Sequence, residues 1–430
     1  MANRFWVGGT GTWNGSSTAN WSATSGGASG ASAPTTSDAV TFDSASGTGT
    51  CTTAAGATAA SVTINSSTVA VTLGANMTVL GAFTLTLGTL SLGSYILTAQ
   101  YLASNNSNVR SIAFGTGRID LTGNNIAIVS VSPATNFTAS GTRNVRLTYS
   151  GATGTRSVLG ATGVTESNCL SVAVAAGTDS FHCQIVNNLD FTGFSGTFVN
   201  TLAHTIYGNL TLSATMTIAS GTNGIYMAGT TGPYTITTNG VTFNSPLFIA
   251  GAGGTFQLAD NLTLASTRAL TLTAGTFDAN GKNVSLGSFA LTSGTKTLTL
   301  GSGVWTVTGT SWNANTAVAG LTVSASTATI TMTSSSAKTF SGGGKSWPTL
   351  NQGGSGALTI QQSNSFADIT TSVTPATVTL TSGTTQTVSA FTLSGASGAQ
   401  VTLNASTPGS AATLSRASGN TSVSYLTLSD

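Results

Sequence analysis

The feature that most constrains this chain is a strict alternation of Thr or Ser with aliphatic residues from about residue 60 onward. Residues 82–90 read AFTLTLGTL and residues 269–277 read ALTLTAGTF. Side chains of a β-strand alternate between two faces, so a period of two predicts strands with one buried and one solvated face. Only 5% of the residues are charged, against about 25% in ordinary globular domains. The pattern therefore favours a durable structural protein over a catalyst.

Composition narrows the class further. The 430-residue chain is 40% hydrophobic and has only 7 prolines, which argues against a disordered Ser/Thr-rich stalk. The net charge is +2, and the densest basic group, formed by Arg143, Arg146 and Arg156, is interpreted as a few solvated surface charges. Nucleic-acid binding typically needs Lys and Arg clustered on one face, so we expect no nucleic-acid partner.

The chain carries no pattern for export or for a membrane span. Its first residues lack the apolar region of a secretory signal, and no stretch approaches the roughly 18 apolar residues of a span. We therefore expect no membrane insertion. Three cysteines, Cys51, Cys169 and Cys183, do not make a disulfide framework. Cys183 shares a predicted strand face with Phe181 and Ile185 and is interpreted as a small buried hydrophobe.

Residues 1–60 differ from the rest of the chain. They contain three of the six tryptophans, Trp6, Trp13 and Trp21, within turn-rich sequence. A stack of coils needs a cap because its open end exposes unpaired strand edges. We interpret residues 1–60 as a cap or docking segment, with a sugar-binding platform as the alternative.

The remaining sequence contains diverged repeats. The motif NMTV at 76–79 returns as NLTL at 209–212 and at 261–264, and residues 114–123 align with residues 300–309. We predict a first β-solenoid block over 61–245, a duplicated block over 246–335 and a short-strand region over 336–430. The predicted fold is an all-β parallel β-solenoid with roughly 20–25 residues per coil. Tandem β-sandwich or jelly-roll domains are the alternative.

Candidate catalytic groups are scarce. Glycosidases usually need two carboxylates about 5–10 Å apart. Glu166 is the only glutamate, and the aspartates closest in sequence are Asp38 with Asp43 and Asp179 with Asp190. Most aspartates lie beside Gly, Asn or Ser, which is typical of turns. Neither His182 nor His204 lies near a Gly-x-Ser-x-Gly elbow, so we predict no enzymatic activity.

Binding motifs are equally weak. The spacing of Cys169, His182, Cys183 and His204 matches no zinc site, and neighbours in a strand point to opposite faces. We expect no metal and no cofactor. Frequent Thr-x-Thr pairs fit ice binding, but Thr is also an ordinary strand residue. Glycan binding through Trp305, Trp312 or Trp347 is an alternative to local packing of three isolated side chains.

Several segments resemble a group of Thr/Gly-rich bacteriophage proteins. The resemblance lies in residues 4–13 (RFWVGGTGTW) with 20–22 (NWS), in 104–117 (SNNSNVRSIAFGTG), and in 381–388 with 407–410. It covers most of the chain and implies a β-helix-like virion component, such as a fibre, a spike or a head decoration. Similar segments occur in bacterial surface proteins, and the resemblance defines no functional residues that carry over.

Together these observations predict a non-enzymatic structural protein of a bacteriophage particle. It would form a rigid surface projection that covers the virion or contacts the host. Expected partners are other capsid or tail proteins, further copies of the chain in a homo-oligomer such as a trimer, and a host-surface glycan. The alternative is a bacterial cell-surface adhesin or self-assembling extracellular fibre, and a glycan depolymerase spike ranks third.

Overall fold

The computed structural model describes residues 2–124, 127–160, 162–292, 294–315, 318–325 and 327–429. Every regular element in these ranges is a β-strand, which confirms the all-β prediction. The chain divides into two compact units, Met1–Thr217 and Ile218–Asp430, and the division falls inside β26. This division does not test the predicted boundaries at residues 60, 245 and 335, which stay predictions.

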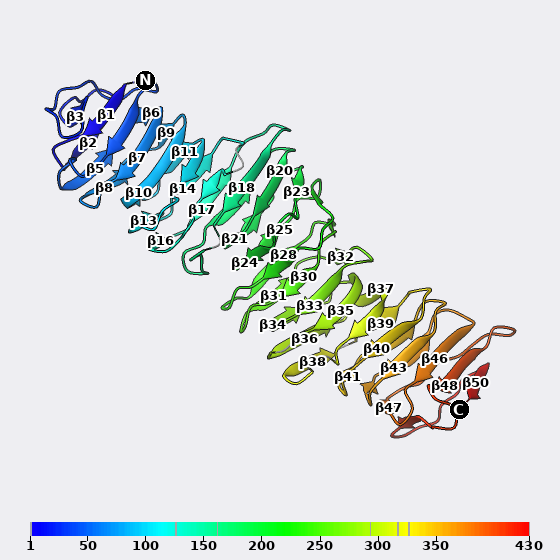
Figure 1. The fold of residues 1–430 in the computed structure, drawn as a ribbon. Coiled ribbons are helices and arrows are strands. Elements are labelled where there is room, and N and C mark those ends of the chain that lie inside the picture. Colours follow the sequence, from blue (N-terminus) through cyan, green and yellow to red (C-terminus); the bar gives the residue numbers. More distant parts are fainter. Residues whose placement is uncertain are drawn as a thin grey trace. The chain divides into compact units, whose positions relative to one another are not determined.

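The strands of the first unit are short except for the ten-residue β10 (Figure 1). They are β1 (Asn3–Trp6), β2 (Gly11–Trp13), β3 (Trp21–Ser22), β4 (Ala39–Phe42), β5 (Gly49–Thr53), β6 (Thr58–Ala59), β7 (Ser61–Asn65), β8 (Val69–Leu73), β9 (Met77–Val79), β10 (Ala82–Ser91), β11 (Ile96–Ala99), β12 (Tyr101–Ala103), β13 (Arg110–Ala113), β14 (Arg118–Leu121), β15 (Val129–Ser130), β16 (Phe137–Ser140), β17 (Asn144–Leu147), β18 (Thr155–Leu159), β19 (Ser171–Val174), β20 (Ser180–Cys183), β21 (Ile185–Val186), β22 (Leu189–Asp190), β23 (Thr197–Phe198), β24 (His204–Ile206), β25 (Leu210–Thr211) and β26 (Thr217–Ile218).

The second unit also consists of β-strands. Its strands are β27 (Ile225–Met227), β28 (Tyr234–Thr237), β29 (Thr242–Phe243), β30 (Leu247–Ile249), β31 (Thr255–Leu258), β32 (Leu262–Leu264), β33 (Ala269–Leu272), β34 (Gly275–Asp278), β35 (Val284–Leu291), β36 (Lys296–Gly301), β37 (Val304–Asn313), β38 (Leu321–Ala325), β39 (Thr329–Met332), β40 (Lys338–Ser341), β41 (Ser346–Trp347), β42 (Thr349–Gln352), β43 (Leu358–Gln361), β44 (Ser365–Phe366), β45 (Ile369–Thr371), β46 (Ala376–Leu380), β47 (Thr385–Val388), β48 (Val401–Ala405), β49 (Thr413–Arg416) and β50 (Leu426–Ser429).

In the first unit, each strand pairs in parallel with the strand one coil later. One ladder runs through β1, β4, β7, β10, β12, β15, β18, β20 and β23. A second runs through β2, β5, β8, β10, β13 and β16. A third runs through β6, β9, β11, β14, β17, β19, β22 and β25. Parallel ladders between successive coils define a parallel β-solenoid, which confirms the predicted fold. The antiparallel pair of β1 and β3 is a local exception at the N-terminal end.

Parallel ladders also build the second unit. One joins β28, β31, β34, β36 and β38, and another joins β41, β44, β47 and β49. The other strands from β27 to β50 form two interleaved ladders that share the long strands β35 and β37. Each unit is therefore a stack of coils rather than a pair of packed sheets.

Alternation in the sequence sets which side chains face inward. In β14 and β17, Ile119 lies in register with Val145, and Leu121 with Leu147, and all four side chains are buried. Burying an aliphatic side chain of this size stabilises the folded state by about 1.5–3 kcal/mol. The polar residues between them point outward, so each ladder has an apolar inner column and a polar outer column.

Two local interactions explain why asparagine and glycine recur in the sequence. The side-chain oxygen of Asn76 accepts a hydrogen bond from the backbone N–H of Ile96, 20 residues later, and Asn261 does the same for Asn283, 22 residues later. Gly88 turns the long strand β10 between two ladders with φ of 105°, and a Cβ there would lie 2.0 Å from the Ser66 carbonyl oxygen. The asparagines therefore link coils at their turns, and the glycine permits close packing at a corner.

Candidate functional site

The N-terminal tryptophans form one buried cluster. Trp6, Trp13, Trp21 and Phe42 are fully buried, and the ring centroid of Trp21 lies 5.1 Å from that of Trp6 and 5.2 Å from that of Trp13. The Trp6 indole N–H donates to the Gly9 carbonyl oxygen at 2.7 Å. Such edge-to-face packing fits a hydrophobic cap. A sugar platform needs exposed rings, so this alternative is wrong for these three residues, while docking by this segment stays a prediction.

The remaining tryptophans also lie in the core. Trp312 packs 5.8 Å from Trp305 and 5.6 Å from Trp347 between ring centroids, and all three are buried. The interpretation of these residues as isolated was wrong, because distant segments of sequence stack in successive coils. Their burial leaves no ring face for a glycan.

The acidic residues named as catalytic candidates make structural contacts instead. Asp38 accepts hydrogen bonds from the backbone and hydroxyl of Thr35, at 2.9 and 2.8 Å, and Asp43 accepts from Ala45 at 2.9 Å. These bonds close turns, as the neighbouring residue types predicted.

The two aspartates of the second candidate pair have different surroundings. Asp179 forms a fully buried ion pair with Arg156, with 2.7 Å between a guanidinium nitrogen and a carboxylate oxygen. Asp190 is half-buried and accepts hydrogen bonds from the backbone and hydroxyl of Thr192. The interpretation of Arg156 as a solvated charge was therefore wrong, because a partner one coil later neutralises it in the core.

Both histidines are buried, which disfavours their charged form. Burial lowers the pKa of His182 and of His204. His182 Nε2 lies 2.5 Å from the Ser157 hydroxyl oxygen, while its Nδ1 has no hydrogen-bond partner among the described residues. His204 contacts the carbonyl oxygens of Cys183 and Val199. The Ser157–His182 pair thus lacks the acid that orients the histidine in a catalytic triad.

The three cysteines are free and buried. Burial raises the pKa of each thiol, that of Cys169 to about 12. Cys183 is fully buried, which confirms its interpretation as a small hydrophobe. Among the described residues, no group of three His, Cys, Asp or Glu is placed to hold a metal ion. The same residues include no helix long and apolar enough to cross a membrane.

Arg110, Lys296 and Lys338 are further buried cations that bind backbone carbonyls. Arg110 donates to the carbonyl oxygens of Ser104 at 3.0 Å, of Asn108 at 2.8 Å and of Thr135 at 3.0 Å. Lys338 donates to the carbonyl oxygen of Ser334 at 3.0 Å and also to those of Gly354 and Gly356. These contacts hold loops on the coils and explain the arginine in segment 104–117 as a structural residue.

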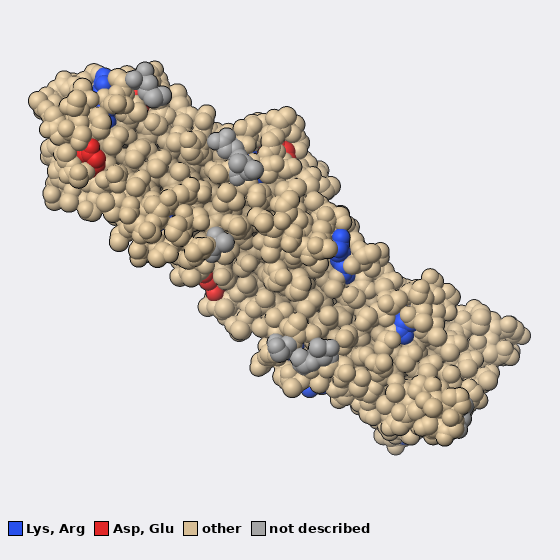
Figure 2. Space-filling view, viewed as in Figure 1, with Lys and Arg blue, Asp and Glu red and all other residues tan. Residues whose placement is uncertain are grey.

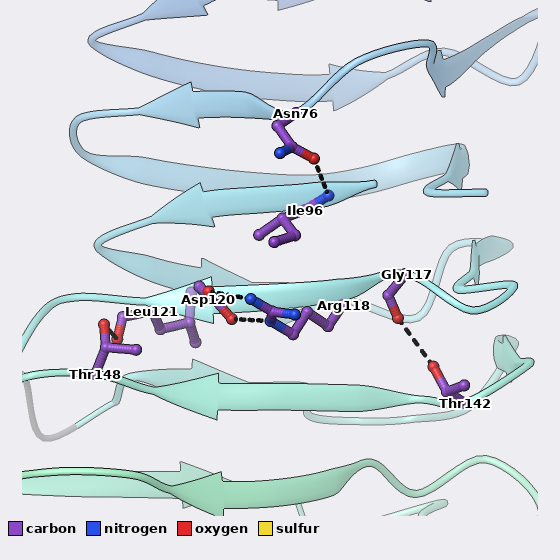
Figure 3. A network of polar contacts seen from close by, with 8 residues as sticks. All are labelled: Asn76, Ile96, Gly117, Arg118, Asp120, Leu121, Thr142 and Thr148. Carbon is purple, nitrogen blue, oxygen red and sulfur yellow. Dashed lines mark hydrogen bonds and ion pairs between the residues drawn. The ribbon is translucent and has the colours of Figure 1, made fainter. Parts of the chain in front are cut away.

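Charged side chains meet on the outer face of β14, β17, β19 and β22, which we call the charged face. It consists of Arg118, Asp120, Asn144, Arg146, Ser171, Ala173, Asn188 and Asp190. Arg118 Nε donates to Asp120 Oδ1 at 2.8 Å within β14 (Figure 3). On the side shown in Figure 2, blue and red side chains are widely scattered on a neutral surface. The charged face is therefore the candidate functional site.

The sequence contains a signal for this face in the alternation of two strands. Arg118, Asp120 and Arg146 occupy outward positions of strands whose inward positions are Ile, Leu and Val. Distance along the sequence groups Arg146 with Arg143 and Arg156 instead, and this grouping misses the charged face. The register of β14 with β17 places Asp120 beside Arg146, a neighbour 26 positions along the chain. The alternation predicts whether each side chain points inward or outward. Which residues lie beside each other on adjacent strands depends on the length of each coil.

Comparisons of the chain with protein-family models, with curated proteins and with solved structures find no match. The parallel β-solenoid fold is thus what the structure establishes.

Proposed function

We propose that this protein is a non-enzymatic structural component of a bacteriophage particle, forming a rigid surface projection that covers the virion or contacts the host. The observation that carries the proposal is the fold itself. In each unit, backbone hydrogen bonds join every coil to the next over long parallel ladders, and the outward positions are mostly neutral Thr, Ser and Asn. The resemblance to Thr/Gly-rich phage proteins supplies the virion location.

Surface composition supports a role outside the cell. The chain has 12 Lys and Arg among 430 residues, so few sites are open to trypsin. Burial removes Arg110, Arg156, Lys296 and Lys338 from that number. Ladder hydrogen bonds and apolar inner columns also oppose local opening, which proteolysis of a folded chain requires.

The positions of the carboxylates support the non-enzymatic part of the proposal. Asp120 and Asp190 share one outward column but lie three strands apart, with Arg146 and Ala173 between them. At about 4.8 Å per strand this separation is roughly 14 Å between Cα atoms, more than the pair of a typical glycosidase. A depolymerase therefore remains the weakest candidate.

A second candidate, a self-assembling surface fibre, is favoured by one observation. An apolar hollow of about 510 Å³ lies beside β46, β48 and β50 and is lined by Leu380, Phe391, Leu403 and Leu426, with Leu428 70% exposed. Exposed apolar surface of this kind often marks protein–protein contact. A second copy of the chain is the expected occupant if the protein forms filaments by itself.

Antibody labelling of purified particles tests the virion location. Gold-labelled antibodies raised against the chain are added to density-purified phage and to washed cells of the producing culture. The proposal expects label on particles and absence of label on uninfected cells. Label confined to cell surfaces, or to free filaments that contain only this chain, would contradict it.

A further inference from the structure

The charged face contains an incomplete set of polar contacts. Asp120, Arg146, Ala173 and Asp190 form one column, in register from strand to strand. Asp120 is paired with Arg118 on its own strand. Arg146 is exposed, and neither its guanidinium nor the Asn144 amide has a side-chain partner within the described part of the chain.

The small side chain of Ala173 opens a hollow in this column. The hollow measures about 440 Å³ and is bounded by Arg146 and Asn144 on one side and by Asn188 and Asp190 on the other. This volume lies within the range of about 300–1,000 Å³ that is typical of small-ligand sites. Ser171 and Val172, which are both buried, also line the hollow.

Hydrogen bonds hold the far side of the hollow in place. The Asn188 amide donates to the Ser171 hydroxyl at 3.2 Å, and its oxygen accepts from the backbone N–H of Asn209 at 2.8 Å. Asp190 is held by Thr192 at 2.6 Å. A carboxylate with two oxygens has acceptor sites beyond these bonds. The Asp190 side is therefore ordered before any ligand arrives.

The chemistry of the two sides selects the ligand. A free guanidinium recognises a carboxylate through two parallel hydrogen bonds. Asp190 and the asparagine amides suit hydroxyl groups, which both donate and accept. A long polyanion would meet the two aspartates of the column and find no run of cations. We propose that the charged face binds a carboxylated saccharide, with its carboxylate on Arg146 and its hydroxyls toward Asp190.

This inference extends the proposed role in host contact, because an acidic glycan of a host envelope would be the natural ligand. The glycan-binding proposal can be wrong even if the proposed virion role is right. Binding is measured on the isolated chain, whereas the virion location is measured on particles.

The test is a glycan array that displays oligosaccharides of uronic and sialic acids beside their neutral methyl esters. The full chain is expected to bind at least one carboxylated oligosaccharide and not its methyl ester. Binding is then measured by titration of that oligosaccharide. Arg146→Ala is expected to weaken it at least about tenfold, and Arg146→Lys by less, because the ammonium keeps the charge but loses the planar fork.

Two further variants serve as a second test and as a control. Ala173→Gln leaves Arg146 intact but puts a longer side chain between Arg146 and Asp190, and it is expected to abolish binding. Lys282→Gln removes one positive charge from a turn of the second unit and is expected to leave binding unchanged. Circular dichroism confirms that each variant remains folded. Failure of the wild-type chain to bind any carboxylated glycan, or equal binding by Arg146→Ala, would overturn the proposal.

Discussion

The outer faces of two ladders carry opposite chemistry on the same backbone geometry. On the charged face of the first unit, one column contains Asp120, Arg146 and Asp190. On β31, β34, β36 and β38 of the second unit, the corresponding outward column reads Thr255, Thr276, Thr297 and Thr322. Both ladders keep apolar residues inward. The comparison teaches that inward apolar residues and backbone hydrogen bonds hold successive coils together. Outward residues can differ between ladders and so can serve a function.

The largest expected effect tests whether the buried ion pair of the first unit stabilises the fold. Asp179→Asn breaks the fully buried pair with Arg156 and leaves the guanidinium charge without its counter-ion. We expect the free energy of unfolding to fall by about 3–5 kcal/mol. Urea unfolding followed by circular dichroism measures the loss.

The matched variant is Asp278→Asn on the outer face of the second unit. Asp278 accepts a hydrogen bond from Gln257 at 3.0 Å and from the backbone of Asn280 at 2.8 Å. We expect a loss of about 1 kcal/mol or less, as for other surface polar contacts. An equal loss in both variants would break the distinction between interior and outer face.

A second prediction concerns the corner of β10. Gly88→Ala puts a Cβ against the Ser66 carbonyl and strains a backbone with φ of 105°. Backbone strain of this kind costs about 1–3 kcal/mol, and the contact adds to it. Gly240→Ala has φ of 79° but no atom within 4 Å of the new Cβ. Its melting temperature is therefore expected to lie above that of Gly88→Ala, and the reverse order would show that close coil packing is unimportant there.

A third prediction concerns pH. Burial lowers the pKa of Lys338 to about 8 in the folded chain, against about 10.4 in an unfolded chain. Between these values the unfolded chain binds a proton that the folded chain does not. The Lys338 contribution to stability therefore rises as pH increases from 8 to about 10.4, and it is lost as pH falls back.

The measurement is the free energy of unfolding at pH 7, 8.5 and 10. Lys338→Met is expected to flatten the increase with pH. Lys282→Met changes a half-buried turn residue and serves as the control. A wild-type profile that matches that of Lys338→Met would contradict the buried position of this ammonium group.

The smallest expected effect lies on the charged face itself. Arg118→Gln removes the ion pair with Asp120, in which the arginine side chain is 39% exposed. Surface pairs contribute about 0–1 kcal/mol, so the melting temperature is expected to change little. A large fall in melting temperature would mean that the charged face stabilises the coils. Its residues could then not vary freely to suit a ligand.

The sequence predicted the fold well because alternation acts locally. The inward positions of β14 and β17 follow directly from the pattern of Ile119, Leu121, Val145 and Leu147. The buried role of the N-terminal tryptophans also followed, since a stack of coils needs a closed end. These features depend on neighbours in sequence and on general geometry.

Features that depend on coil length could not be predicted. Residues 114–123 and 300–309 align, yet the first contains the four-residue strand β14 and the second begins the ten-residue strand β37. The pairing of Arg156 with Asp179 spans 23 residues. The column of the charged face needs the register of β14, β17, β19 and β22. Small insertions change which residues become neighbours, and alternation carries no information about them.

Electron cryo-microscopy of the intact particle or assembly that contains this chain tests the central claim most directly. The account predicts density for a parallel β-solenoid on the outside of a capsid or tail, with the charged face open to solvent. A free filament built only of this chain would contradict the virion role and favour a self-assembling surface fibre.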